Sequence, residues 1–278
     1  MITVVIPTLG NRIELINSAL DSVNSQSCKP REILVINNGS KSILESLVST
    51  EVVLREFLIP NRAGVSQARN FGASLSTTPY ISFLDDDDFW HIDYLKNITS
   101  KIQSSPDIIL SRLDKFFPDH TRVPFMNATD RLSISDFLLF NPGATGSNTT
   151  VLKTSFFDLG GFDPKLPPAE DSALVLDALL MGLSVVVESN AISYMRIHSG
   201  DRLTDAKFAI RGYREFLKKY RGKMTFRTQV FNLWRIYREE SKIPKVVISK
   251  IIYLVLSFAI ITLRVTPKSI WHPESIKD

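Results

Sequence analysis

Four consecutive aspartates, Asp85 to Asp88, directly follow the short apolar run Tyr80–Leu84. The run has the aromatic and β-branched composition of a buried strand, so the aspartates should lie where that strand leaves its sheet. Carboxylates this close together repel and raise one another's pKa unless a cation neutralises them. The fold must therefore open this strand end to a cation. The alternative is a solvated acidic loop in which Asp88 caps the following helix.

The first part of the chain alternates strand and helix patterns. Short β-branched runs predict strands, and between them apolar residues recur at helical spacing. The predicted strands are Thr3–Ile6, Glu32–Ile36, Val52–Ile59 and Tyr80–Leu84, and the predicted helices are Asn11–Gln26, Ser42–Ser49 and Ala63–Ser76. This alternation indicates an α/β fold with a mainly parallel central sheet. Ligands of such sheets bind at the carboxyl ends of the strands, where the four aspartates lie.

The pattern is less regular after a helix predicted at Leu95–Ser104 and a strand at Ile108–Leu110. Prolines and a glycine interrupt residues 115–150, where we expect a second, mixed part to begin. A helix at Asp171–Met181 and strands at Ser184–Glu188 and Ile192–Ile197 follow, and the chain reads as mostly helical from Thr204 onward. We predict three parts: an α/β part at residues 1–110, a mixed part at residues 111–202, and a basic helical extension at residues 203–278.

Hard carboxylate oxygens suit Mg²⁺ or Mn²⁺, which proteins commonly share with substrate phosphates. The aspartates therefore predict a divalent ion clamping a diphosphate. The chain has no GxG sequence and no GxxxxGK[ST] motif. It therefore lacks the dinucleotide-binding fingerprint and the P-loop, so any nucleotide must be held in another way.

Cysteine content and the start of the chain indicate a reducing compartment. The single cysteine, Cys28, makes neither an internal disulfide nor a Cys-cluster zinc site. Met1 runs straight into the apolar segment Ile2–Ile6, without the basic segment and cleavage site of a signal peptide. We expect the protein to work in the cytoplasm.

The net charge of +4 conceals an asymmetry. Residues 202–250 hold 14 Lys and Arg against 4 Asp and Glu, a net +10, whereas residues 1–201 carry a net −7. The apolar stretch 246–265 follows, and its uninterrupted part, Ile251–Leu263, is 13 residues long. A bilayer span needs about 20 apolar residues, so this pattern favours an anchor lying on an anionic membrane surface. A true span, a buried core helix and a subunit contact are the alternatives, and we expect no nucleic-acid partner.

Several motifs together resemble the family 2 glycosyltransferases. The matching segments are VVIPTLGNR at 4–12, VINNGS at 35–40, PNRAGVSQARNFGASLSTTPYISFLDDDDFW at 60–90 and GGFDPKLPPAED at 160–171. They follow the family's order over roughly residues 2–200. The resemblance implies a GT-A fold, a nucleotide-sugar donor and inversion at the anomeric carbon. It also implies that residues 1–110 bind the nucleotide sugar and that residues 111–202 bind the acceptor and carry the catalytic base.

The resemblance also implies roles for single residues. Pro7 and Thr8 would border the nucleobase pocket with Arg12 nearby, and Arg69 would face the diphosphate. Asn38 stands where the family usually has an aspartate that bonds uracil, although an amide still pairs with a pyrimidine edge. The remaining motif, Asp85-x-Asp87, matches the family's DXD motif, with Asp85 or Asp86 towards the ribose and Asp87 on the metal.

A general base is needed to take the proton of the attacking hydroxyl. Glu170 and Asp171 stand at the start of a predicted helix, and the resemblance assigns Asp171 as the base and Glu170 as an acceptor ligand. Helix capping is the alternative for both carboxylates. His198 is similar to the family's histidine downstream of the base, which ligates the metal or touches the diphosphate. Trp90 is either a sugar-stacking residue or part of the core.

The leading hypothesis is an inverting, metal-dependent hexosyltransferase. It would move glucose or galactose from a UDP-sugar to a glycan on undecaprenyl diphosphate, in bacterial O-antigen or capsule assembly at the cytoplasmic face of the inner membrane. The alternatives are transfer of rhamnose from dTDP-rhamnose, a nucleotidyltransferase, and a non-catalytic sugar- or lipid-binding protein on the same fold.

Overall fold

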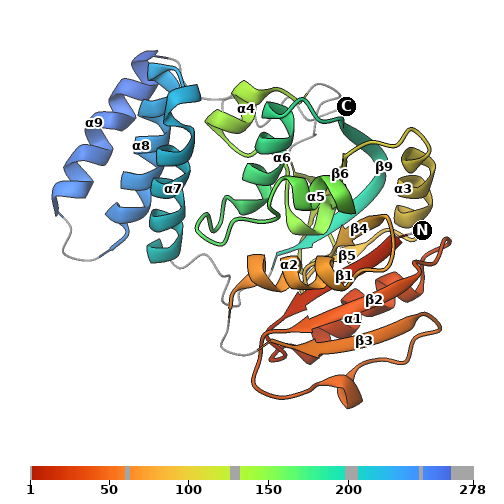
Figure 1. Cartoon of the computed structure of the whole chain (residues 1–278). Coiled ribbons are helices and arrows are strands. Elements are labelled where there is room, and N and C mark those ends of the chain that lie inside the picture. The colour runs from red at the N-terminus through yellow and green to blue at the C-terminus, as the bar shows by residue number, and fades with distance from the viewer. Residues whose placement is uncertain (1, 60–62, 126–131, 198–205, 244–246, 264–278) are drawn as a thin grey trace.

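The computed structural model describes residues 2–59, 63–125, 132–197, 206–243 and 247–263. One mixed sheet runs through the molecule in the strand order β3-β2-β1-β4-β8-β6-β9-β5, with β7 paired to β6. Helices cover both faces of this sheet, and three further helices extend from one side (Figure 1).

The first half of the sheet is parallel. β1 (Ile2–Thr8) lies between β2 (Glu32–Asn37) and β4 (Tyr80–Phe83), and β3 (Val53–Leu58) forms the edge beside β2. Helix α1 (Ile13–Asn24) connects β1 to β2, and α2 (Val65–Leu75) connects β3 to β4. The carboxyl ends of β1, β2 and β4 therefore meet at one edge of the sheet.

The second half is mixed. β8 (Thr149–Leu152) runs antiparallel to both β4 and β6 (Ile108–Phe116), and β6 runs parallel to β9 (Val185–Arg196). Two short strands complete the sheet, β5 (Phe89–Trp90) on β9 and β7 (Arg122–Pro124) on β6. The predicted α/β class with a largely parallel central sheet is confirmed.

Alternate residues of β1 serve the two helical layers. Val4 and Ile6 pack with α1 and with α3 (Tyr94–Ile102) on one face of the sheet. Val5 points to the other face. That face is covered by α2, α4 (Ile134–Leu139), α5 (Lys153–Asp158) and α6 (Glu170–Leu180). Burial on both faces explains why β1, β2 and β4 are continuous apolar runs rather than alternating ones.

The helix predicted at Ser42–Ser49 is wrong, because only the 3₁₀ turn Leu44–Ser46 forms there. The Glu56 carboxylate accepts the backbone N–H groups of Ile43 and Leu44, and the Asn17 side chain accepts that of Val48. These side-chain acceptors replace the carbonyls that an α-helix would supply.

Two strand predictions were too short. The strand predicted at Ile108–Leu110 continues to Phe116, because Lys115 and Phe116 pair with the following β7. The strands predicted at Ser184–Glu188 and Ile192–Ile197 form one strand, β9, with a register irregularity opposite Ser111 and Arg112. That irregularity explains the break in the apolar pattern.

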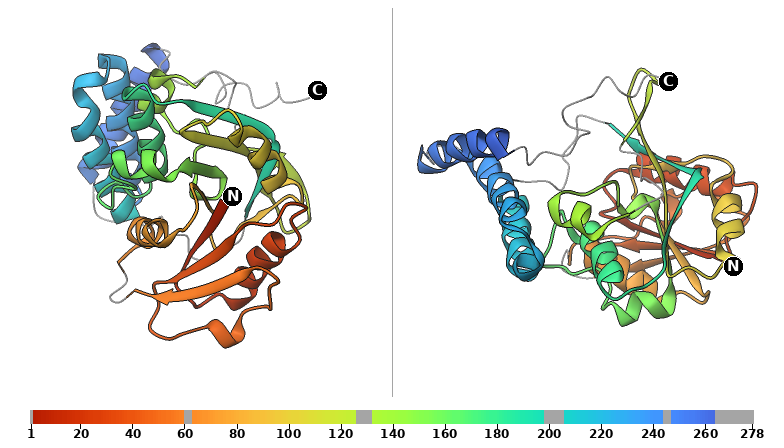
Figure 2. Two further views of the ribbon diagram at one scale, coloured as in Figure 1. Left: turned by 45° about the vertical axis from the view of Figure 1, so that its right-hand side comes forward. Right: turned by 90° about the horizontal axis from the view of Figure 1, so that it is seen from above.

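The predicted helical extension is present. It consists of α7 (Ala206–Tyr220), α8 (Phe226–Ser241) and α9 (Val247–Leu263), and α8 lies between the other two (Figure 1). α7 belongs to the main core through the buried side chains of Phe216 and Tyr220, and Met224, after the turn that follows α7, joins them there. Viewed from above, α8 and α9 project away from the sheet (Figure 2). Among the described helices none is long and apolar enough to cross a bilayer.

Candidate active site

The acidic cluster lies at the carboxyl end of β4, beside the end of β1. The Thr8 hydroxyl at the end of β1 donates a hydrogen bond of 2.6 Å to Asp86 and accepts one of 3.0 Å from the Gly10 N–H. Pro7 and Thr8 are both buried. The two neighbouring parallel strands are thus joined where they leave the sheet.

Arg12, which precedes α1, neutralises two of the aspartates. Its guanidinium lies 2.5 Å from an Asp86 carboxylate oxygen and 2.9 Å from one of Asp87. Burial raises the pKa of Asp86 to about 6, against the lowering effects of Thr8 and Arg12. The repulsion expected from consecutive carboxylates is therefore partly answered by an arginine of the chain itself.

Asp88 faces inward rather than capping the next helix. Its carboxylate accepts hydrogen bonds from the Ser147 hydroxyl, at 2.5 Å, and from the Arg196 N–H, at 3.0 Å. Burial, followed by the charges of Asp87 and Asp85, raises its pKa well above the usual range. The N-cap position of α3 belongs to Asp93. Asp88 therefore fastens the end of β4 to the loop before β8 and to β9.

Arg69 connects the strand end to the predicted base. This α2 side chain is 3% exposed, and its guanidinium lies 2.6 Å from Asp85 and 2.9 Å from Asp171. Glu170 lies 3.5 Å from the same guanidinium. Burial alone would lower the pKa of Arg69, but Asp171, Asp85 and Glu170 raise it above its ordinary value. Residues distant in the sequence thus meet at one buried cation.

The pKa of Asp171 lies well above the ordinary carboxyl range. Burial raises its pKa to about 8, with Arg69 opposing that shift and with Glu170 and Asp85 adding to it. Burial also raises the pKa of Glu170, against the charge of Arg69. The second carboxylate oxygen of Glu170 is buried without a hydrogen-bond partner. A buried acceptor without a partner is rare in folded proteins, which marks the Glu170 carboxylate as a candidate contact for a bound group.

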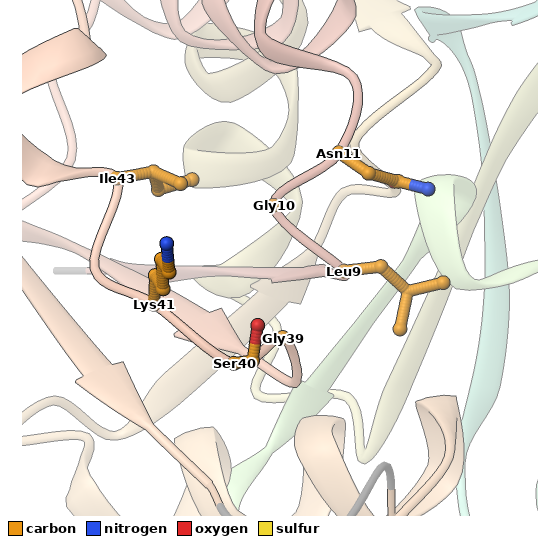
Figure 3. Close-up of a pocket in the computed structure, with 7 residues that line it drawn as sticks. All are labelled: Leu9, Gly10, Asn11, Gly39, Ser40, Lys41 and Ile43. Carbon is orange, nitrogen blue, oxygen red and sulfur yellow. The ribbon is translucent and has the colours of Figure 1, made fainter.

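A cavity of about 360 Å³ opens between the loops that follow β1 and β2. Figure 3 shows these two loops facing each other, with Lys41 and Ile43 on one side and Asn11 on the other. Its lining residues are Leu9, Gly10, Asn11, Gly39, Ser40, Lys41 and Ile43. The sequence predicted Pro7, Thr8 and Asn38 here, and the lining consists of the residues that directly follow them. Their position just beyond two strand ends is the signal that locates them.

Asn38 is buried at the end of β2, where its side-chain oxygen accepts the Ala63 N–H at 2.8 Å. The neighbouring Asn37 donates to Glu56 at 2.6 Å, and Glu56 holds the loop that carries Ser42. Glu56 lies on the edge strand β3, and sequence reasoning did not identify it. Its four contacts to this loop shape one wall of the cavity.

The carboxylate oxygens of the acidic cluster are ligands that suit a divalent ion. The Asp85 and Asp87 side chains are 28% and 23% exposed, so both are partly accessible from solvent. Mg²⁺ is often held by one or two carboxylates together with substrate phosphates. The described residues contain no group of three or more His, Cys, Asp or Glu side chains placed to hold a metal by themselves. His198, the other predicted ligand, lies outside the described residues.

Trp90 belongs to the core rather than to a sugar site. It is 3% exposed, stacks on Tyr94 with ring centroids 4.1 Å apart, and donates its indole N–H to the Ser147 carbonyl. Ser147 and Gly146, in the loop before β8, do border the cluster. Sequence reasoning did not identify these contacts with Arg69, Asp85 and Asp88, because nothing in the local sequence marks them.

The sheet and the strand-end site together define a GT-A-type nucleotide-sugar transferase fold. The Glycosyl transferase family 2 profile matches residues 3–157, more than half of the chain, and the chain belongs to that family. The expected resemblance is thereby confirmed, and the protein is a glycosyltransferase.

Two relatives show the range of similarity. The amylovoran biosynthesis glycosyltransferase AmsB of Erwinia amylovora is 30% identical over 66% of this chain and 66% of its own length. An uncharacterized glycosyltransferase of Rickettsia typhi is 23% identical over 81% of this chain and 73% of its own length.

The fold is also similar to a solved structure, Staphylococcus aureus TarS 1–349 in complex with UDP-GlcNAc. The TM-score is 0.63 with 15% identity, covering 86% of this chain and 71% of that one. At that identity the similarity extends to the fold alone.

Proposed function

We propose that the protein transfers a hexose from a UDP-sugar to a sugar hydroxyl of a diphosphate-linked lipid acceptor, with inversion, during bacterial polysaccharide assembly. The observation that carries this proposal is the buried Arg69. It joins the end of β4, where a donor diphosphate would bind, to Asp171 at the start of α6. The proposed phosphate site and the proposed base therefore contact the same arginine side chain.

In the proposed reaction Asp171 accepts the proton of the acceptor hydroxyl, and that oxygen forms a bond to the anomeric carbon. The bond from the anomeric carbon to the diphosphate oxygen breaks, and the nucleoside diphosphate leaves from the opposite face. Glu170 would orient the acceptor through its unpaired oxygen. A base whose pKa lies near the working pH combines a useful fraction of carboxylate with adequate basicity.

We propose Asp87, with the donor's phosphates, as the binding site for Mg²⁺ or Mn²⁺, and His198 as a further ligand. When bound, the ion would stabilise negative charge on the leaving diphosphate. Arg12 contacts Asp87 and would have to share that carboxylate with the ion. The chain's own contribution is the pair of arginines that hold the carboxylates in place.

A uridine donor is supported by the cavity at the ends of β1 and β2, and by the UDP-GlcNAc and UDP in the similar TarS structures. The similarity to the amylovoran enzyme supports a role in polysaccharide assembly. Asn38 offers an amide where the family has a carboxylate, so dTDP-rhamnose is the rival donor. We place the reaction at the cytoplasmic face of the inner membrane, where lipid-linked acceptors are built.

The test is nucleoside-diphosphate release from a panel of UDP-hexoses and dTDP-rhamnose, with a lipid-diphosphate-linked amino sugar as acceptor. We expect acceptor-dependent release from one donor, lost in EDTA and reduced about 10²- to 10⁴-fold in Asp171→Asn. Activity that survives EDTA would remove the metal from the proposal. No release from any donor by the folded protein would favour the non-catalytic alternative.

A further inference from the structure

Helix α9 turns polar side chains towards the protein. The Ser249 hydroxyl donates a 2.6 Å hydrogen bond to Glu240 of α8, and the Ser257 hydroxyl accepts one of 3.0 Å from the Trp234 indole. Ile260, on the same side, packs with Val230 of α8. These contacts fix which side of α9 faces the molecule.

The opposite side of α9 is apolar and open. Ile248, Ile251, Leu254 and Val255 are 57–72% exposed in the described part of the chain. Their spacing of three and four residues places them on one stripe, which we call the α9 outer face. A helix that only covers a protein in water shows the reverse distribution, with serines outside and large apolar side chains inside. Contiguous exposed apolar side chains of this kind mark an interaction site.

The extension that carries this face is positively charged. Lys250 is exposed and lies one helical turn before Leu254. Three exposed arginines of the extension make no ion pair with another described residue: Arg211 on α7, Arg221 in the turn after α7, and Arg227 on α8. A second copy of the chain would bring two such basic segments together, and like charges would repel. An anionic surface would neutralise them instead.

We propose that the α9 outer face docks on an anionic lipid bilayer, with α9 lying in the plane of the headgroups. The apolar side chains would enter the boundary between headgroups and acyl chains, while Lys250 would reach the lipid phosphates. This proposal sharpens the anchor predicted from sequence to one face of one helix. It does not depend on the transfer reaction, because docking needs neither donor nor acceptor.

The test is co-flotation of the full-length protein with vesicles of phosphatidylcholine containing about one-third phosphatidylglycerol, compared with pure phosphatidylcholine vesicles. We expect binding to the anionic vesicles that weakens with salt. The triple variant Ile251→Ser, Leu254→Ser, Val255→Ser should lose at least about tenfold in partitioning, and Lys250→Glu should also weaken it. Val53→Ser is the matched control, because Val53 is 61% exposed on the edge strand β3, away from the extension.

Absence of vesicle binding by the folded wild-type protein, or undiminished binding by the triple variant, would overturn the proposal. If the triple variant instead converts a dimer to a monomer in sedimentation, with no lipid binding by either form, the face is a contact between copies. Asp171→Asn should float like the wild type, whereas the triple variant should keep its turnover on a detergent-solubilised acceptor. Failure of docking and failure of the proposed reaction are thus distinguishable.

Discussion

At the scale of single residues, the site depends on a space that a glycine leaves for Arg69. A Cβ at position 146 would lie 2.8 Å from Nε of Arg69 and 2.5 Å from its Cζ. The guanidinium has no easy retreat, because it is buried and paired with Asp85 and Asp171. Gly146 is therefore needed for its missing side chain.

We expect Gly146→Ala to reduce kcat/KM about 10- to 100-fold, because displacing a positioning group by about 1 Å costs that much. The protein should still fold, because the change adds one methyl group and no charge. The matched control is Gly222→Ala, where a Cβ meets nothing within 4 Å. Steady-state kinetics with the active donor makes the comparison. Equal activity of both variants would show that Arg69 needs no fixed position.

The raised pKa of Asp171 predicts a pH profile. Because its pKa is about 8, the proton-accepting carboxylate is the minority form below that pH. We expect kcat/KM to rise with pH from about 7 to about 9 and then to level off. Arg69 lowers this pKa, so Arg69→Gln should move the rise to higher pH. A rise near pH 4, the ordinary carboxyl range, would contradict the assignment of Asp171 as a buried base.

At the scale of helices and strands, sequence pattern predicts those elements that bury whole faces. β1, β2, β4 and α1 follow from apolar runs and helical spacing, since both faces of the sheet are covered. The pattern fails where a side chain distant in the sequence determines the backbone conformation. Glu56 stabilises a turn where a helix was predicted at Ser42–Ser49, and no local sequence feature indicates that contact.

The same reasoning applies to the site. The aspartates and the pair Glu170–Asp171 can be predicted from the sequence, because the first follow a strand and the second begin a helix. Their shared contact with Arg69 cannot be predicted without the motifs of a family, since it joins residues up to 102 positions apart. Ser147 and Gly146 cannot be predicted as site residues for the same reason, because their partners at the site lie on other elements of the fold.

Helix α7 packs directly against the loop before α6, the helix that carries the proposed base, Asp171. A Cβ at Gly212 would lie 2.6 Å from the carbonyl carbon of Pro167, which precedes α6 by a few residues. In an exposed helix, replacing glycine by alanine stabilises by about 1 kcal/mol. At position 212 we expect the reverse, because α7 or the loop must move.

Gly212→Ala should therefore lower both the melting temperature and kcat, since the loop positions Glu170 and Asp171. Thermal unfolding and kinetics measure the two effects. Lys218→Ala, an exposed change on the same helix, is the control and should alter neither. A more stable, fully active Gly212→Ala protein would show that the packing of α7 does not constrain the loop before α6.

At the scale of the whole molecule, the C-terminal extension has two different attachments. α7 completes the main core with Phe216 and Tyr220, which are 1% and 3% exposed. α9 rests on α8, with its outer face open. We expect the first attachment to contribute to folding and the second to present the face proposed to dock on lipid.

This division predicts different outcomes for two shortened chains. Chain 1–205 loses the burial of Phe216 and Tyr220, about 3 to 6 kcal/mol in all, which is a large share of a typical stability of about 5 to 15 kcal/mol. It should melt far below the full-length protein or fail to fold. Chain 1–243 keeps α7 and α8, so it should fold and turn over a detergent-solubilised acceptor, yet fail to float with anionic vesicles. Thermal unfolding, kinetics and flotation of the same preparations test all three expectations.

A stable, active 1–205 chain would mean that α7 is dispensable to the core. Vesicle binding by 1–243 would mean that the lipid-facing surface lies elsewhere than on α9.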